Sequence, residues 1–437
     1  MSDAVLIQNG RLFCPVSDID QHGDLEIRGG QVSRVALGGG IPVTDQSVYD
    51  VKGAVVCIGF LDLHTHVGEP GFEYKEDIFS ASAAAAAGGF VAICVSSQSS
   101  PVNDNRSITE HIRRRGEDAA GARMLPIATL SMGAEGKRLT EMFDLRDGGA
   151  VAFGDGERGH CDAGLMRRAM EYANAVGCPV FECPQDPHLA GVGVMHEGAV
   201  ATRLGLKGIP VAAEEIAVAR AVALSRQTGA PVHIGPLSAG VSVEAIRQAK
   251  RQGIPVTSSV TAAHLVLTDE DVARTWSSSL HLEPPLRETR DRDALRLGVA
   301  DGTIDAISSG HRPQSGVEKD VPFGRAIPGM SGLETAFSIV MGLVDEGVLT
   351  LTRAIEALTG GPRRALRTDE VALADGSVGD VVVFDPRAPY TVSREASLSK
   401  SLNTPFLGQT LRGRVQLTFV EGRLAFEAAD GIKEMNR

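Results

Sequence analysis

The chain has 437 residues, of which 43% are hydrophobic and 22% charged, and its net charge is −12. This length exceeds one usual hydrophobic core, so a large domain with a smaller companion is expected. The composition is ordinary for a globular protein, and the acidic balance disfavours nucleic acid and anionic membranes as partners.

The chain shows no export or membrane signal. Its first residues, Met1–Ile7, lack the charged-then-apolar pattern of a secretory signal, and no run of about 18 apolar residues suggests a membrane span. Six cysteines are scattered without CxxC pairing, which is typical of reduced thiols. We therefore expect a cytoplasmic protein.

The two ends of the chain, residues 1–53 and 370–437, carry short alternating segments broken by glycines. These segments are Ala4–Ile7, Asp24–Ile27, Val32–Val35, Val378–Phe384 and Val415–Val420. Alternation of apolar and polar residues predicts half-buried strands. Neither end has enough apolar sequence to fold alone, so we expect both to pair into one small β-sandwich domain.

The middle of the chain, residues 54–369, alternates between β-rich and helical patterns. Strands are predicted for the run from Ala54 to His66 and for Phe90–Val95, Met124–Leu130, Ala150–Phe153, Pro179–Cys183, Pro231–Ile234, Ile254–Thr257 and Ile304–Ser308. Helices are predicted for Ile78–Ala87, Ile108–Glu117, Ala163–Val176, Glu214–Gln227, Val241–Gln252 and Arg290–Ala300. This α/β pattern demands a parallel sheet, and eight units suit a closed (β/α)8 TIM barrel.

The first barrel strand ends in a His-x-His pair, His64 and His66. On an extended strand, side chains two residues apart point to the same side, so both imidazoles can meet one cation. A hydrolytic metal site also needs ligands from other strands, a base and groups that hold the substrate.

Further motifs follow this pair in a recognisable order. They are Phe60–His66, Glu69–Gly71, Tyr74–Glu76, Ala84–Gly89, Leu165–Ala169, Pro284–Arg287, Asp301–Asp305 and Gly332–Ala336. Over nearly its whole length the chain resembles the bacterial class I dihydroorotases of the amidohydrolase superfamily. The resemblance implies a barrel-plus-sandwich fold and a zinc-centred reaction that reversibly cyclises carbamoyl aspartate to dihydroorotate.

The resemblance also implies a set of metal ligands, which this chain keeps only in part. The first-strand histidines are His64 and His66, and the fourth-strand acidic ligand is Asp155. Cys183 holds the place of the fifth-strand histidine, and thiolate is also a zinc ligand. Pro236, at the sixth-strand histidine position, has no ligating side chain. We interpret His64, His66, Asp155 and Cys183 as vestigial metal candidates; no cofactor is expected, with zinc as the alternative.

The catalytic base and the substrate clamp of this family are replaced as well. The aspartate after strand eight is Gly310, which cannot act as a base. Gly68 replaces the arginine that follows the His-x-His pair, and Gln98 replaces the asparagine after strand two. Glu283 replaces the asparagine before Pro-Pro-Leu-Arg and would repel a carboxylate substrate. We therefore predict no catalytic residue for the dihydroorotase reaction.

These substitutions lead to two hypotheses. The first is a non-catalytic subunit, because the resemblance includes dihydroorotase-like proteins that assemble with aspartate transcarbamoylase, the preceding enzyme of pyrimidine biosynthesis, and support it. The expected partner is then the aspartate transcarbamoylase catalytic subunit, the chain is a homo-oligomer, and His64 and His66 only pack the barrel mouth. The alternative is a metal-dependent cyclic amidohydrolase of altered substrate, with one metal at His64, His66, Asp155 and Cys183.

Overall fold

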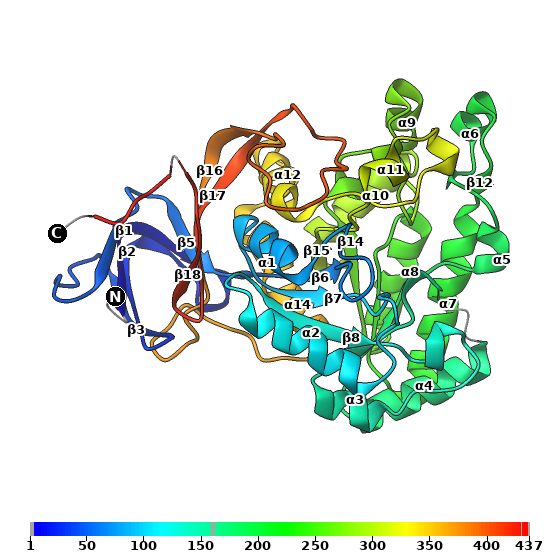
Figure 1. The fold of residues 1–437 in the computed structure, drawn as a ribbon, viewed down its shortest axis with the longest axis horizontal. Helices are drawn as coiled ribbons and strands as arrows, with labels where there is room; N and C mark the ends of the chain where they lie inside the picture. Colours follow the sequence, from blue (N-terminus) through cyan, green and yellow to red (C-terminus); the bar gives the residue numbers. More distant parts are fainter. Residues whose placement is uncertain (1–3, 159–161, 430, 436–437) are drawn as a thin grey trace.

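In this computed structural model, the described residues are 4–158, 162–429 and 431–435. They form a β-rich domain, which contains both ends of the chain, and a barrel of parallel strands covered by helices (Figure 1). One of the six cysteines, Cys161, lies outside the described residues.

The β-rich domain is built from strands of both chain ends. These are β1 (Ala4–Cys14), β2 (Ile19–Arg28), β3 (Gln31–Leu37), β4 (Ser47–Asp50), β5 (Val55–Ile58), β16 (Val381–Thr391), β17 (Thr410–Val420) and β18 (Arg423–Glu427). Their order is β18-β17-β16-β5-β1-β2-β3, and β4 also pairs with β1. Val381 of β16 pairs antiparallel with Ile58 of β5, so the two ends meet in one sheet. The predicted pairing of the chain ends is confirmed.

The barrel contains eight parallel strands in the order of the sequence. They are β6 (Phe60–Thr65), β7 (Phe90–Val95), β8 (Arg123–Ala128), β9 (Ala152–Phe153), β10 (Val180–Glu182), β13 (Val232–Ile234), β14 (Val256–Thr261) and β15 (Ala306–Ser308). The Asp62 carboxylate of β6 accepts hydrogen bonds from the Ser309 backbone N–H (2.6 Å) and hydroxyl (2.7 Å), which brings the last strand back to the first. The predicted TIM barrel is confirmed.

The run predicted as one strand from Ala54 to His66 is two strands. Its first part, β5, lies in the sheet of the β-rich domain, and its second part, β6, is the first barrel strand. Between them the Gly59 N–H donates to the Asp380 carbonyl (2.9 Å), so the chain crosses from one sheet to the other at this residue. Apolar periodicity alone could not reveal the crossing, because both strands are buried.

Helices surround the barrel. They are α1 (Ile78–Ala87), α2 (Arg106–Asp118), α3 (Met142–Gly148), α4 (Ala163–Ala175), α5 (Pro187–Ala190), α6 (Ala199–Leu204), α7 (Val211–Thr228), α8 (Gly240–Arg251), α9 (Asp269–Thr275), α10 (Thr289–Ala300), α11 (Gly316–Lys319), α12 (Leu333–Asp345), α13 (Leu351–Leu358) and α14 (Gly360–Leu366). A two-stranded sheet of β11 (Met195–His196) and β12 (Gly208–Ile209) lies apart from the barrel sheet. The six predicted helices are confirmed. Within the described ranges no helix has the length and apolarity that crossing a membrane requires.

Helix α12 was not predicted, although it has 13 residues. Most of its residues are buried, because it packs between α1 of the barrel and β17 of the β-rich domain (Figure 1). A helix covered on several sides lacks the polar face that gives an amphipathic pattern. It joins the two parts of the fold.

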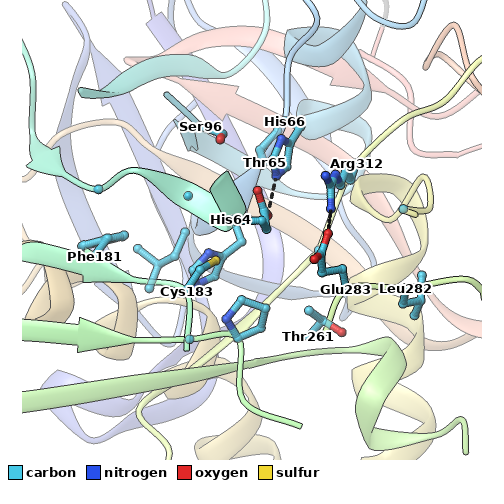
Figure 2. Close-up of a pocket in the computed structure, with 18 of the residues that line it drawn as sticks. His64, Thr65, His66, Ser96, Phe181, Cys183, Thr261, Leu282, Glu283 and Arg312 are labelled. Carbon is cyan, nitrogen blue, oxygen red and sulfur yellow. Dashed lines mark hydrogen bonds and ion pairs between the residues drawn. The ribbon is translucent and has the colours of Figure 1, made fainter. Parts of the chain in front are cut away.

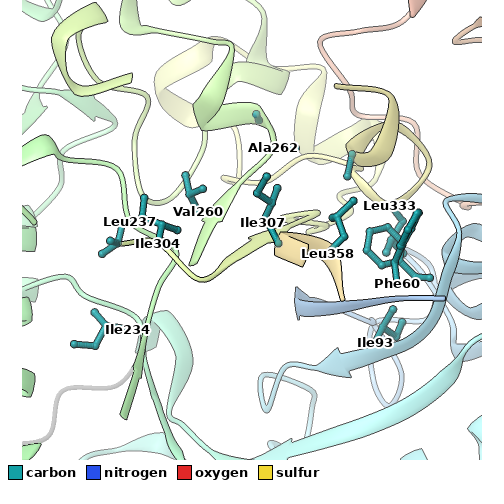
Figure 3. Packing of buried hydrophobic residues seen from close by; sticks show 14 of the residues in the cluster. Phe60, Ile93, Ile234, Leu237, Val260, Ala262, Ile304, Ile307, Leu333 and Leu358 are labelled. Atoms are coloured by element: carbon teal, nitrogen blue, oxygen red, sulfur yellow. The ribbon is translucent and has the colours of Figure 1, made fainter. Parts of the chain in front are cut away.

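The carboxyl ends of the barrel strands surround a cavity (Figure 2), and the other end of the first strand begins at Phe60 in the hydrophobic core (Figure 3). Phe60, the first residue of β6, stacks on Phe337 of α12 with ring centroids 5.2 Å apart. It also contacts Phe90 of β7 and Phe384 of β16. One fully buried ring thus holds the barrel, α12 and the β-rich domain together.

We predict that Phe60→Ala destabilises the protein by about 3–5 kcal/mol, because the deletion leaves a cavity among three other aromatic rings. Urea unfolding followed by circular dichroism measures the effect. The matched control is Phe143→Ala, since the Phe143 side chain in α3 is 59% exposed. A loss no larger than that of the control would contradict the role of Phe60.

Candidate functional site

The cavity at the carboxyl ends of the barrel strands, here called the mouth cavity, encloses about 780 Å³, its open mouth included. One part of its wall is apolar and consists of Leu63, Ile127, Phe181, Pro236, Leu282 and Met330. The other part carries His64, His66, Glu157, Cys183, His264, Glu283 and Arg312. An apolar wall with a few convergent polar groups is typical of a small-molecule site.

His64 lies at the carboxyl end of β6 and is held by a serine. Its Nε2 is 2.8 Å from the Ser259 hydroxyl, and Nε2 of His233 is 3.0 Å from the same oxygen. A hydroxyl has one proton, so Ser259 donates to one imidazole and accepts from the other. Burial lowers the pKa of His64 to about 4, so this imidazole is neutral near pH 7. His233 packs on its strand and also contacts the Thr257 hydroxyl through Nδ1 (3.0 Å).

His66 contacts a carboxylate that the sequence did not reveal. Its Nε2 is 3.1 Å from Oε1 of Glu157, and the two side chains are 20% and 15% exposed. Burial alone would raise the pKa of Glu157, but His66 and Arg312 outweigh it and hold that pKa well below its usual range. The other oxygen of Glu157, Oε2, is buried and has no hydrogen-bond partner in the described part of the chain.

Cys183, directly after β10, also lines the mouth cavity. Burial, together with the nearby carboxylates of Glu157 and Glu182, raises the pKa of the Cys183 thiol well above its usual value. The thiol is therefore protonated near pH 7, and it would have to lose this proton to act as a nucleophile or to bind a metal.

Asp155 is not presented to the mouth cavity like the other candidates. Its Oδ1 accepts from the backbone N–H groups of Leu130 (2.7 Å) and Ser131 (3.0 Å), and its Oδ2 accepts from the Ser131 hydroxyl (2.6 Å). The carboxylate therefore fixes the loop after β8. Glu157, two residues later in a short 3₁₀ turn, lines the cavity in place of Asp155.

Glu283 and Arg312 form an ion pair in the wall of the mouth cavity (Figure 2). Arg312 Nη1 donates to Glu283 Oε2 (3.0 Å), and Gln185 Nε2 donates to the other oxygen (2.8 Å). Burial lowers the pKa of Arg312, but Glu157 and Glu283 outweigh burial and raise it. The guanidinium thus stands between two carboxylates.

Gly68 and Gly310 stand where the resemblance implies an arginine and an aspartate, and neither position has room for a side chain. A Cβ on Gly68 would lie 2.2 Å from the Phe72 carbonyl oxygen, so an arginine cannot stand there without a backbone shift. Gly310 has φ +62°, and its Cβ would lie 2.7 Å from the Thr261 side chain. The backbone is adapted to glycine at both positions.

The structure thus brings most of the predicted site residues together and adds three others. His64, His66, Cys183, Pro236, Gly310 and Glu283 line the mouth cavity. Gln98 lies behind it and donates to the Asp155 carbonyl (3.3 Å). Sequence reasoning missed Glu157, Ser259 and Arg312. Of these three residues, Arg312 alone could have been found from the sequence, because it lies two residues after Gly310, the position of the expected base.

The comparisons with known proteins agree with this architecture. A family model described as "Dihydro-orotase-like" matches residues 53–241. The dihydroorotase of Anaeromyxobacter sp. (strain K) is 46% identical over 428 residues, covering 98% of this chain and 99% of the relative. The dihydroorotase of Pelobacter propionicus is 41% identical, with 97% and 99% covered.

Solved structures show the same fold at lower identity. The L-hydantoinase (dihydropyrimidinase) from Arthrobacter aurescens superimposes with a TM-score of 0.86 at 21% identity, covering 99% of this chain and 98% of the hydantoinase. The dihydropyrimidinase from Brevibacillus agri NCHU1002 gives a TM-score of 0.81 at 21% identity, with 97% and 95% covered.

The prediction that the chain needs no cofactor is wrong. Its relatives are dihydroorotases, a class that the sequence resemblance describes as zinc-dependent, so a metal cofactor is expected. The side chains as placed do not fit one, because no three His, Cys, Asp or Glu residues of the described ranges group closely enough to hold an ion. Nε2 of His64 and Nε2 of His66 would first have to leave Ser259 and Glu157.

Buried histidines predict a pH-dependent stability. Burial lowers the pKa of His64, His264 and His281 to about 4 each, whereas an unfolded histidine titrates near pH 6.5. The unfolded state therefore binds more protons between these values, so the free energy of unfolding falls as pH falls from about 6.5 to 4. Each such histidine adds a slope of up to about 1.4 kcal/mol per pH unit.

Urea unfolding from pH 4.5 to 8 measures this slope. His264→Gln removes one titrating group, so the free energy of unfolding changes less steeply with pH, by up to about 1.4 kcal/mol per pH unit. The matched control is His188→Gln, because His188 is exposed. Equal slopes in the wild type and His264→Gln would contradict the assignment.

Proposed function

Since the chain belongs to the dihydroorotase-like family of amidohydrolases, we propose that it opens and closes a cyclic amide ring in the mouth cavity, with a substrate other than dihydroorotate. One observation carries the proposal: His66 and Glu157 contact each other beside an arginine in a cavity with an apolar wall. A cyclic amide offers a flat apolar ring, N–H donors and a carbonyl oxygen to such a cavity.

The side chains supply two parts of this chemistry. Ring opening requires a base that takes a proton from the attacking water and an acid that returns a proton to the leaving nitrogen. Glu157 Oε2 accepts no other hydrogen bond among the described residues, and its other oxygen contacts His66. The Arg312 N–H groups can stabilise the negative charge that develops on the carbonyl oxygen.

We predict that the purified protein hydrolyses a cyclic amide and that Glu157→Gln lowers kcat about a hundredfold, because glutamine cannot take the proton. Turnover of dihydroorotate, dihydrouracil and hydantoin is followed by ring absorbance, after chelation and again with added zinc. Glu346→Gln, an exposed carboxylate on the outer surface, is the control. Absence of turnover of dihydrouracil and hydantoin in both metal states would contradict the proposal, as would preferential turnover of dihydroorotate.

A second function is favoured by a different observation. Pro236 and Gly310 occupy cavity positions where the resemblance implies a metal ligand and a base, and the Asp155 carboxylate fixes a loop instead. A chain without these groups could serve as a non-catalytic subunit that supports aspartate transcarbamoylase. Its partner would be the transcarbamoylase catalytic subunit, and the chain would form a homo-oligomer.

Size-exclusion chromatography with light scattering tests this second function. Mixed with the aspartate transcarbamoylase of its own organism at micromolar concentration, the chain is expected to co-elute as a stoichiometric complex. Glu157→Gln is expected to co-elute equally, because a supporting role does not use the cavity. Separate elution of the two proteins would contradict this function.

A further inference from the structure

The polar groups of the mouth cavity indicate which kind of ring it accepts. We infer that this cavity binds an uncharged cyclic amide or ureide whose N–H group bonds Glu157, and that it rejects the same ring when the ring carries a carboxylate. The inference rests on the proposed function and names its class of substrate.

The first step concerns the cation that a carboxylate would need. Arg312 is the one arginine or lysine that lines the mouth cavity in the described part of the chain. Its Nη1 is already paired with Glu283 at 3.0 Å. Glu283 is held in turn by Gln185 at 2.8 Å, so both oxygens of this carboxylate are fixed and the ion pair is braced.

The second step concerns room for another cation. At Gly68 any side chain would collide with the backbone carbonyls of Phe72 and Glu76, at 2.2 and 2.6 Å from its Cβ. Position 68 therefore supplies no second cation. A ring carboxylate would meet two carboxylates, Glu157 and Glu283, and one guanidinium that is already paired, and such like-charge contacts disfavour its binding.

The third step concerns the group that the cavity lacks. Glu157 Oε2 is a buried acceptor without a partner in the described ranges, although its other oxygen is bound to His66. An unpaired buried acceptor is costly and is satisfied by a ligand that donates a hydrogen bond. The N–H of an amide or ureide ring is such a donor, and a carboxylate offers none. Phe181 and Leu282 provide apolar surface for the faces of the ring.

Isothermal titration calorimetry with dihydrouracil and dihydroorotate tests the inference, because these rings differ only in the carboxylate. Titrations are made with wild-type protein, in parallel after chelation and with added zinc. Dihydrouracil is expected to bind at least about tenfold more tightly in the same metal state. Tighter or equal binding of dihydroorotate, or binding of neither ring, would overturn the inference.

Glu283→Gln is the variant that locates the selectivity. It removes one carboxylate and releases Arg312, so the affinity for dihydroorotate is expected to rise about tenfold or more while that for dihydrouracil changes little. Glu171→Gln is the matched control, since Glu171 pairs with Arg167 on the outer face of α4. An unchanged ratio of the two affinities in a folded Glu283→Gln protein would overturn the inference, with folding checked by thermal unfolding.

Binding and turnover separate the two proposals. Tight binding of dihydrouracil without hydrolysis of any ring would contradict the proposed hydrolase and leave the substrate class standing. Hydrolysis of hydantoin or dihydrouracil by a protein that binds dihydroorotate as tightly as dihydrouracil would contradict the substrate class and leave the proposed hydrolase standing.

Discussion

The mouth cavity depends on one buried carboxylate at the seam of the barrel, which is the junction between β6 and the segment after β15. Asp62 is fully buried in β6 and accepts hydrogen bonds from the backbone and hydroxyl of Ser309 and from the hydroxyl of Thr65. A buried carboxylate is tolerated only when such donors surround it, so the strand that carries His64 and the segment after β15 cannot separate without a large cost. The His66 N–H, which donates to the His311 carbonyl (2.7 Å), extends this seam to the cavity.

Closure of the seam explains why the charges of the cavity lie in pairs. It places the ends of β6 and of the segment after β15 side by side, with His66 on one and Arg312 on the other. The two carboxylates between them, Glu157 and Glu283, each take one of these partners. A buried ion pair gains little stability over apolar packing, so stability alone does not account for the Arg312–Glu283 pair in the cavity. The proposed selection of an uncharged ring would give this pair a role.

The sequence predicted the barrel, because alternating strands and helices with short connections permit few other folds. Helix α1 matches its predicted bounds, since Asp77 caps a run of alanines. The site was less predictable, because a residue's place in a motif does not fix the direction of its side chain. Asp155 stands where an acidic ligand was expected, yet the backbone amides of Leu130 and Ser131 bind its carboxylate, and the next turn presents Glu157 instead.

The departures from the family pattern are fixed by packing as well as by sequence. A Gly310→Asp change would introduce the carboxylate that the resemblance implies, but its Cβ would collide with the Thr261 side chain. The backbone at this position also has a conformation that favours glycine. An arginine at position 68 would collide with two backbone carbonyls, at Phe72 and Glu76. Neither group can return without a shift of the surrounding chain. In place of that base and clamp, the cavity presents Glu157, Glu283 and Arg312 to a ligand.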